Sequence, residues 1–207
     1  MDLLGTDAVL ASNALSGKTA LICGASRGIG AATARIMAAA GANVIVSARN
    51  QDQLDLLLEE LNTLGNGNHQ TLVMDLEDTK GISSNINPLI NQNPIHILVN
   101  NAGLALGRGP IDTGLTEDWD QMIDTNVKGL LYMTKAIIPF MKANKKGHIV
   151  NISSIAGKEV YPGGNVYCAS KHAVDALSKA MRMDLVDYGI KVTNIAPGAA
   201  ETEFSLV

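Results

Sequence analysis

Basic charge, cysteine, aromatic residues and long apolar runs are all scarce in this chain of 207 residues. The 16 basic residues are outnumbered by 20 acidic ones, and the longest basic run is Lys145-Lys146. This balance argues against a nucleic-acid partner. No apolar stretch approaches the roughly 20 residues that cross a bilayer, so no membrane partner is expected either.

The two cysteines and the N-terminus show no sign of export or metal binding. Cys23 and Cys168 are far apart and fit neither a metal-ligand nor a CxxC spacing, so we expect no metal site and a reduced, cytoplasmic protein. Asp2 and Asp7 lie where a signal peptide would be basic. Residues 1–14 are therefore expected to form a short N-terminal extension.

The chain is rich in apolar residues, 46% of the total, and these are divided by 20 glycines. Short apolar runs alternate with helical patterns from end to end. The expected strands are Thr19–Cys23, Asn43–Ser47, Thr71–Met74, Ile95–Val99, His148–Ile152 and Lys191–Ile195. The expected helices are Ala31–Ala40, residues 54–64 after a cap at Asn50, Gly81–Ile90, residues 117–142 and Val166–Tyr188. This alternation predicts an α/β fold, a Rossmann-type doubly wound parallel sheet that forms a single domain over residues 15–207.

A glycine-rich loop follows the first expected strand. Residues 24–30 read GASRGIG, which has the spacing GxxxGxG rather than GxGxxG. Glycines at such a turn let the backbone approach a pyrophosphate, and the next helix offers its positive N-terminal end. The loop therefore predicts a dinucleotide site, with a plain tight connection as the structural alternative.

The same loop also matches GxSxG, the nucleophile elbow of serine hydrolases, with Ser26 as the nucleophile. A hydrolase needs an acid and a histidine on later loops. The histidines instead lie in or beside expected strands, or within an expected helix: His69, His96, His148 and His172. The hydrolase alternative is therefore disfavoured.

The end of the second expected strand decides between the two dinucleotides. An NAD site usually has an acidic residue here for the ribose 2′-hydroxyl, but residues 47–50 read SARN. Arg49, with Arg27 and Ser26 of the glycine loop, can bind a 2′-phosphate through charge-assisted hydrogen bonds. The missing acid favours NADP, whereas the alternative is that both arginines are only solvated surface residues.

Tyr167 and Lys171 are four residues apart in an expected helix and so project from the same face. A nearby ammonium favours the phenolate, and we expect it to lower the tyrosine pKa by about 1–3 units. Such a pair suits proton transfer during hydride exchange. Ser153-Ser154 and the sequence NNAG at residues 100–103 follow expected strands, at the sheet edge where ligands bind.

Taken together, these features make the chain resemble a short-chain dehydrogenase/reductase from Leu15 to Val207. The matching features are GASRGIG (24–30), Asp75 after the third strand, NNAG (100–103), Asn126, Ser154, YCASK (167–171) and Pro197-Gly198. The resemblance implies an NADP-dependent enzyme acting on CH–OH groups. Cys23 is a departure, since it replaces the threonine usual before the first glycine, and a thiol is a weaker hydrogen-bonding group than a hydroxyl.

The resemblance also implies roles for individual residues. Tyr167 would be the general acid/base, and Lys171 would lower its pKa and bind the nicotinamide ribose. Ser154 would hold the substrate oxygen and Asn126 would anchor a water of the proton relay. The implied NADP-binding residues are Gly24, Ser26, Arg27, Gly28, Ile29, Gly30, Arg49, Asp75, Leu76, Asn101, Ala102, Gly103, Tyr167, Lys171, Pro197 and Gly198.

The second half of the chain, roughly residues 100–205, is most similar to NADP-dependent 3-hydroxy acid dehydrogenases that also oxidise serine. The expected substrate is thus a small hydroxy acid or the corresponding carbonyl compound, and Arg108 is either its carboxylate contact or a surface residue. Two alternatives remain: a 3-oxoacyl thioester reductase, and a non-catalytic NADP-binding scaffold, against which the intact tetrad argues.

Assembly and length complete the expectations. The helix expected at 117–142 carries more apolar residues than one stripe needs, as in the helices through which family members form dimers and tetramers. A homo-oligomer, such as a homotetramer, is therefore expected, and the alternative is that these apolar residues only pack on the sheet. The resemblance also implies a further helix and a seventh strand after Val207, so the domain is expected to be C-terminally incomplete here. If those residues are never made, Lys191–Ile195 becomes an unprotected sheet edge; if they follow Val207, the enzyme interpretation is unchanged.

Overall fold

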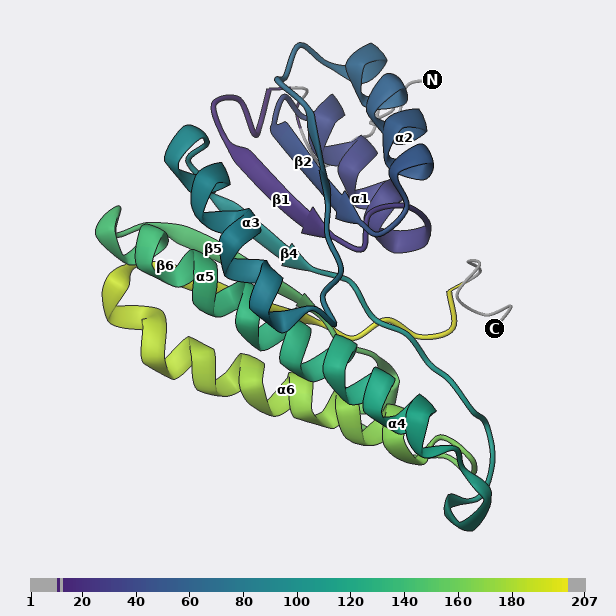
Figure 1. The fold of residues 1–207 in the computed structure, drawn as a ribbon. Coiled ribbons are helices and arrows are strands. Elements are labelled where there is room, and N and C mark those ends of the chain that lie inside the picture. Colours follow the sequence, from purple (N-terminus) through teal and green to yellow (C-terminus); the bar gives the residue numbers. More distant parts are fainter. Residues whose placement is uncertain (1–10, 12, 201–207) are drawn as a thin grey trace.

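A computed structural model describes residue 11 and residues 13–200 of the chain. Six strands form one parallel sheet in the order β3-β2-β1-β4-β5-β6 (Figure 1). The strands are β1 (Thr19–Cys23), β2 (Asn43–Ala48), β3 (Gln70–Val73), β4 (Ile97–Asn100), β5 (Gly147–Ile152) and β6 (Ile190–Ile195). This order is that of the Rossmann sheet, and it confirms the predicted fold class.

The helices lie on both faces of the sheet. They are α1 (Gly28–Ala39), α2 (Gln51–Leu64), α3 (Thr79–Gln92), α4 (Thr116–Ile123), α5 (Leu130–Ala143) and α6 (Asn165–Leu185). A π-helical segment, η2 (Asp124–Gly129), joins α4 to α5, and short 3₁₀ turns are η1 (Ile111–Thr113), η3 (Ile155–Gly157) and η4 (Val186–Tyr188). In Figure 1, α1 and α2 lie on one side of the sheet, and α3, α5 and α6 lie on the other.

Alternate strand residues form two separate cores, because successive side chains point to opposite faces of the sheet. Leu21 and Ile45 pack with the α3, α5 and α6 layer, whereas Ile22 and Val44 pack with α1 and α2. All four side chains are fully buried. Burial on both faces explains why the strands read as continuous apolar runs in the sequence.

A buried polar network fixes α5 and α6 against the middle of the sheet. The Asn100 side-chain nitrogen donates to Asn151 Oδ1 and to Thr134 Oγ1, each at 2.9 Å. The Asn151 nitrogen in turn donates to Ser178 Oγ at 2.9 Å. These four residues belong to β4, α5, β5 and α6. Because unpaired buried amides are costly, the network favours one position of α6 relative to β5.

The expected elements all form, with shifted boundaries. The Asn50 cap is confirmed, since its side chain accepts a 3.0 Å hydrogen bond from the Gln53 amide. The helix expected at 117–142 is a continuous helical run from Thr116 to Ala143, but its middle turn is a π segment. Close packing shapes that segment, because a Cβ on Gly129 would lie 2.8 Å from the Leu76 side chain.

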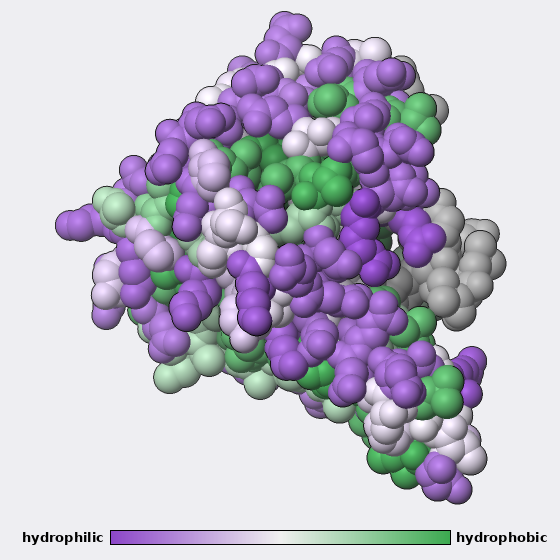
Figure 2. All heavy atoms as spheres, in the orientation of Figure 1, coloured by the Kyte–Doolittle hydropathy of each residue, from purple (hydrophilic) through white to green (hydrophobic). Residues whose placement is uncertain are grey.

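The surface is mostly hydrophilic over α2 and α3 (Figure 2). Hydrophobic residues form separate patches, some of them on the lobe that contains η1 and the start of α4, where Ile111 and Leu115 are exposed. Within the described part of the chain, no helix has the length and apolar character needed to cross a membrane. The extension expected at residues 1–14 lies largely outside the described residues.

Candidate active site

The carboxyl ends of the strands open into a cleft of about 970 Å³, a size at the upper end of the range for small-molecule and cofactor sites. Loops that follow all six strands line it. The order of the strands reverses between β1 and β4, and ligands of open α/β sheets bind at such a switch point.

The glycine loop forms one end of the cleft and is compact for steric reasons. Gly24 and Gly28 have positive φ angles of +68° and +56°, and only glycine adopts these routinely. A Cβ on Gly24 would lie 2.6 Å from the Ala102 Cα atom, and one on Gly30 would lie 2.3 Å from the Gly24 carbonyl oxygen. The glycines therefore let the loop after β1 pack directly against the loop after β4.

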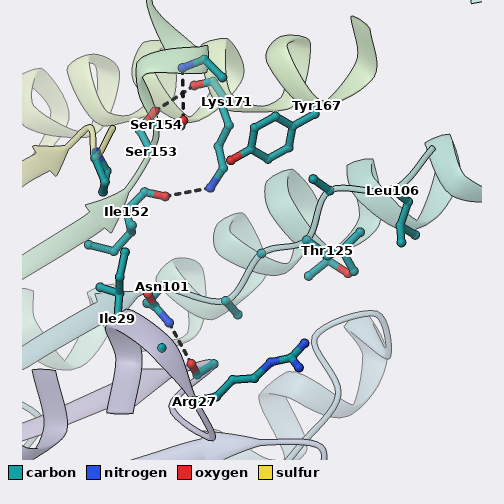
Figure 3. Close-up of a pocket in the computed structure, with 18 of the residues that line it drawn as sticks. Arg27, Ile29, Asn101, Leu106, Thr125, Ile152, Ser153, Ser154, Tyr167 and Lys171 are labelled. Atoms are coloured by element: carbon teal, nitrogen blue, oxygen red, sulfur yellow. Dashed lines mark hydrogen bonds between the residues drawn. The ribbon is translucent and has the colours of Figure 1, made fainter. Parts of the chain in front are cut away.

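Asn101 joins these two loops by a hydrogen bond. Its side-chain nitrogen donates to the Gly24 carbonyl oxygen at 2.8 Å and to the Cys23 carbonyl oxygen at 3.2 Å (Figure 3). The Cys23 thiol is fully buried, and this burial raises its pKa to about 12. Cys23 thus behaves as an inert core residue, and the support of the loop comes from Asn101.

These features fit the predicted dinucleotide. Helix α1 begins at Gly28 with no side chain capping its first turn, so its amide groups face an anion site of the kind that binds pyrophosphate. Ser26 and Arg27 line the cleft beside it, and Arg49 and Asp75 line the cleft after β2 and β3. Arg49 lies 3.5 Å from a Glu77 carboxylate oxygen and 3.9 Å from an Asp75 oxygen.

The opposite wall carries the polar groups expected to do chemistry. Tyr167 and Lys171 project from one face of α6, and the Lys171 ammonium lies 5.8 Å from the centre of the Tyr167 ring. Figure 3 shows the tyrosine hydroxyl directed toward the end of the lysine side chain. Lys171 donates to the Ile152 carbonyl oxygen at 3.0 Å. Ser154 lies next to this group and hydrogen-bonds the Tyr167 side chain.

Burial controls the protonation of this pair. Burial raises the pKa of Tyr167 above its usual value, while the hydrogen bond from Ser154 opposes the rise. Lys171 is 5% exposed, and burial lowers its pKa to about 8. The expected lowering of the Tyr167 pKa is therefore wrong for this structure, because burial disfavours the charged phenolate.

Ser153 supports the same wall from behind. Its buried hydroxyl donates to the Lys171 carbonyl oxygen at 3.2 Å, and its amide donates to the Ile195 carbonyl oxygen at 2.7 Å. The Ser154 hydroxyl accepts from the Ala156 amide at 3.1 Å, which caps η3. The two adjacent serines thus differ, since Ser153 ties β5 to α6 and β6, whereas Ser154 hydrogen-bonds Tyr167.

Asn126 lies behind the cleft wall, 1% exposed. Its oxygen accepts from the Leu104 amide at 2.8 Å, and its nitrogen donates to the Leu104 carbonyl oxygen at 2.9 Å and to Ser170 Oγ at 3.0 Å. The π turn of η2 places it between the 104 loop and α6. Asn126 therefore fixes the loop after β4 against α6, and the water-anchoring role stays a prediction.

The structure brings nearly all the predicted residues to one cleft. Those that line it are Gly24, Ser26, Arg27, Gly28, Ile29, Arg49, Asp75, Leu76, Asn101, Ala102, Gly103, Ser154, Tyr167, Lys171, Pro197 and Gly198. Gly30 and Asn126 are the exceptions, since each is buried one layer behind the lining. The roles of these residues remain proposals.

Sequence reasoning missed Glu77, Thr125 and Asn165, which also line the cleft. Glu77 accepts hydrogen bonds from Thr125 and Gln121. Asn165 donates to the Gly109 carbonyl oxygen at 3.1 Å. No spacing signal identifies any of them, because each acts through a partner that is distant in sequence.

The histidines settle the hydrolase alternative. His69 and His96 accept from the Val44 and Thr19 amides at the amino ends of strands, and His148 contacts Thr193. These positions are remote from the carboxyl edge where Ser26 lies. Among the described residues, the cleft lining contains no histidine, so the GxSxG match is incidental to the glycine loop.

Comparison with known proteins gives consistent matches. The sequence profile of the family described as short chain dehydrogenase matches residues 18–206. Sulfoacetaldehyde reductase 2 of Chromohalobacter salexigens is 43% identical over 189 residues, which cover 90% of this chain and 74% of the relative. The NADP-dependent 3-hydroxy acid dehydrogenase of Schizosaccharomyces pombe is 40% identical over 195 residues, or 93% of this chain and 75% of the relative. The crystal structure of serine dehydrogenase from Escherichia coli has a TM-score of 0.81 at 41% identity, covering 87% of this chain and 82% of that chain.

Replacing Gly24 by alanine tests the packing of the glycine loop. Gly17 has a similar φ of +72° but no heavy atom within 4 Å of an added Cβ, so Gly17→Ala isolates the backbone strain of about 1 kcal/mol. Gly24→Ala adds the clash with Ala102, and we expect it to lower the free energy of unfolding by about 1–3 kcal/mol more. Equal losses in urea denaturation of the two variants would contradict this packing.

Proposed function

The chain belongs to the short-chain dehydrogenase/reductase family, and from this premise we propose that it exchanges hydride between NADP and a 3-hydroxy acid or serine. The observation that carries the proposal is the cluster of Ser154, Tyr167 and Lys171 on the wall of a cleft whose other end fits a dinucleotide. The names of the relatives support the choice of NADP and of a hydroxy acid.

The cleft divides the work of binding between its two ends. We assign the pyrophosphate to the loop 24–30 and the start of α1, the 2′-phosphate to Arg49 with Arg27, and the adenine to Asp75 and Leu76. Asn101, Ala102, Gly103, Pro197 and Gly198 would line the remainder toward the nicotinamide. When bound, NADP supplies the site that accepts or returns the hydride.

Ser154, Tyr167 and Lys171 handle the substrate oxygen and its proton. The Ser154 hydroxyl orients the oxygen beside the Tyr167 hydroxyl, with which it already shares a hydrogen bond. Tyr167 donates a proton to the oxygen in reduction and accepts one in oxidation. Lys171, held at the Ile152 carbonyl, favours negative charge on the phenolic oxygen and would contact the nicotinamide ribose.

The pKa directions indicate how this pair depends on pH. Because the Tyr167 pKa is raised and that of Lys171 is about 8, both groups hold their protons at neutral pH. The pair is therefore ready to protonate a carbonyl there. Oxidation requires the Tyr167 phenolate, so it is favoured as the pH rises toward the raised pKa of Tyr167.

Arg108 is the cationic group best placed to bind the substrate carboxylate. It lines the cleft between the loop after β4 and the loop before α6. The backbone directly after Arg108 is held, since the Gly109 amide donates to the Gly163 carbonyl oxygen at 3.3 Å and Asn165 donates to the Gly109 carbonyl. This anchoring joins Arg108 to the turn that begins the helix bearing Tyr167.

The reductase relative broadens the substrate class in a chemically consistent way. Sulfoacetaldehyde and a 3-oxo acid both place one carbon between the reacting carbonyl and an anionic group. The same Arg108 contact suits a sulfonate or a carboxylate. An acyl thioester lacks that anion, so comparing a free 3-hydroxy acid with its thioester distinguishes this proposal from a thioester reductase.

Assembly and location complete the proposal. We propose a cytoplasmic homo-oligomer that forms through α5 and α6. Leu131 and Tyr132 of α5 and Met183 of α6 are exposed apolar side chains that support this choice. Both cysteines are free and buried, which is consistent with a reducing compartment.

Tyr167→Phe tests the catalytic assignment and excludes the scaffold alternative. The variant keeps the ring but removes the proton donor, so NADP-dependent turnover of serine should fall by about 10²–10⁴-fold. NADPH affinity, measured by fluorescence titration, should change by less than about twofold. The matched control is Tyr132→Phe, which removes an exposed hydroxyl outside the cleft. Unchanged turnover in Tyr167→Phe would refute the mechanism.

Arg108→Ala tests the carboxylate contact. We expect it to raise KM for 3-hydroxypropionate about tenfold or more, because a charge-assisted hydrogen bond is lost. KM for the uncharged methyl ester should hardly change. Arg35→Ala is the control, since Arg35 is paired with Glu60 away from the cleft. Equal effects of Arg108→Ala on acid and ester would eliminate this role.

A further inference from the structure

The Arg49 side chain is engaged by carboxylates. Its Nη1 atom lies 3.5 Å from Glu77 Oε1 and 3.9 Å from Asp75 Oδ2, and the arginine side chain is 60% exposed. Arg49 is also the residue assigned above to the 2′-phosphate of NADP. The inference that follows therefore rests on the proposed function.

Glu77 is held in place by its other contacts. The same Oε1 atom accepts hydrogen bonds from Gln121 Nε2 at 3.0 Å and from Thr125 Oγ1 at 3.1 Å. Gln121 belongs to α4 and Thr125 to the π segment η2, which packing against Leu76 holds at the cleft. The carboxylate is therefore fixed by the α4–η2 region, and Arg49 is the partner free to leave.

The charges at this end of the cleft nearly cancel. Arg27 and Arg49 contribute two positive charges, and Asp75 and Glu77 contribute two negative ones, all on cleft-lining residues. A 2′-phosphate adds negative charge and needs the guanidinium that Glu77 engages. A ribose 2′-hydroxyl, in contrast, can donate a hydrogen bond to a carboxylate.

We propose that Glu77 is a specificity-determining residue, which restrains Arg49 and thereby limits the preference of the enzyme for NADP over NAD. It acts as a positioning residue, through Arg49. The end of β2 lacks the acidic residue that is usual in NAD sites. Glu77, in the loop after β3, partly takes its place because its carboxylate contacts Arg49.

Glu77→Gln tests the proposal, because glutamine keeps an oxygen acceptor for Gln121 and Thr125 and removes the charge. The dissociation constants of NADP and NAD are measured by isothermal titration calorimetry at low and at 1 M salt. We expect the ratio Kd(NAD)/Kd(NADP) to rise about threefold at low salt, the scale of one exposed ion pair. The rise should shrink at 1 M salt, where such charges are screened.

Control variants separate this effect from a general change in charge. Glu59→Gln makes the same charge change on an exposed part of α2 and should leave the ratio unchanged. In an Arg49→Ala background, Glu77→Gln should no longer raise the ratio. If Glu77→Gln does not fold, Glu77→Ser is the second variant, because serine has no carboxylate and is too short to contact Arg49. It should shift the ratio in the same direction.

Three outcomes would overturn the proposal. An unchanged or lower ratio in Glu77→Gln shows that Glu77 does not limit NADP preference. A full rise in the Arg49→Ala background shows that Glu77 does not act through Arg49. Failure of the wild-type protein to bind either dinucleotide overturns the proposed function as well. The first two outcomes overturn only the role of Glu77, so the two proposals can fail separately.

Discussion

The hydrogen bond from the Lys171 ammonium to the Ile152 carbonyl is the interaction on which the rest of the site depends. It places a nearly buried cation at the carboxyl end of β5, where the sheet already opens into the cleft. Burying a charge is costly unless it is paired with polar groups. The position of α6 therefore has to be defined closely, because a shift of the helix would leave the ammonium without its acceptor.

Polar contacts fix the position of α6 on the sheet more closely than an apolar core alone would. The Asn100–Asn151–Ser178 chain joins β4, β5 and α6 through buried amides, and Asn126 joins the loop after β4 to α6 through Ser170. Since each of these groups loses its partner if the helix slides, they favour one register between helix and sheet. This register determines the positions of Tyr167 and Lys171, because both residues lie on α6.

The fold and most of the residues that line the cleft could be predicted from the sequence. Apolar runs, the Asn50 cap and the glycine loop predict local structure, and parallel strands bring their carboxyl ends together, so residues from 24 to 198 meet as expected. The sequence was not sufficient for groups whose behaviour depends on three-dimensional surroundings. The Tyr167 pKa is raised because the side chain is buried, and burial is not visible in a spacing of four residues. Glu77 was missed because its partners come from β2, α4 and η2.

The pH dependence of hydride transfer tests most directly the claim that Tyr167, beside the Lys171 ammonium, is the acid/base group. The measurement is kcat for oxidation at saturating NADP and substrate, from pH 6 to 10, for wild type and Lys171→Met. In the wild type kcat should rise about tenfold per pH unit as the pH approaches the raised pKa of Tyr167. In Lys171→Met the phenolate loses the neighbouring ammonium, so the rise in kcat should be displaced to higher pH by about one unit or more. Superimposable profiles of the two proteins would contradict the account.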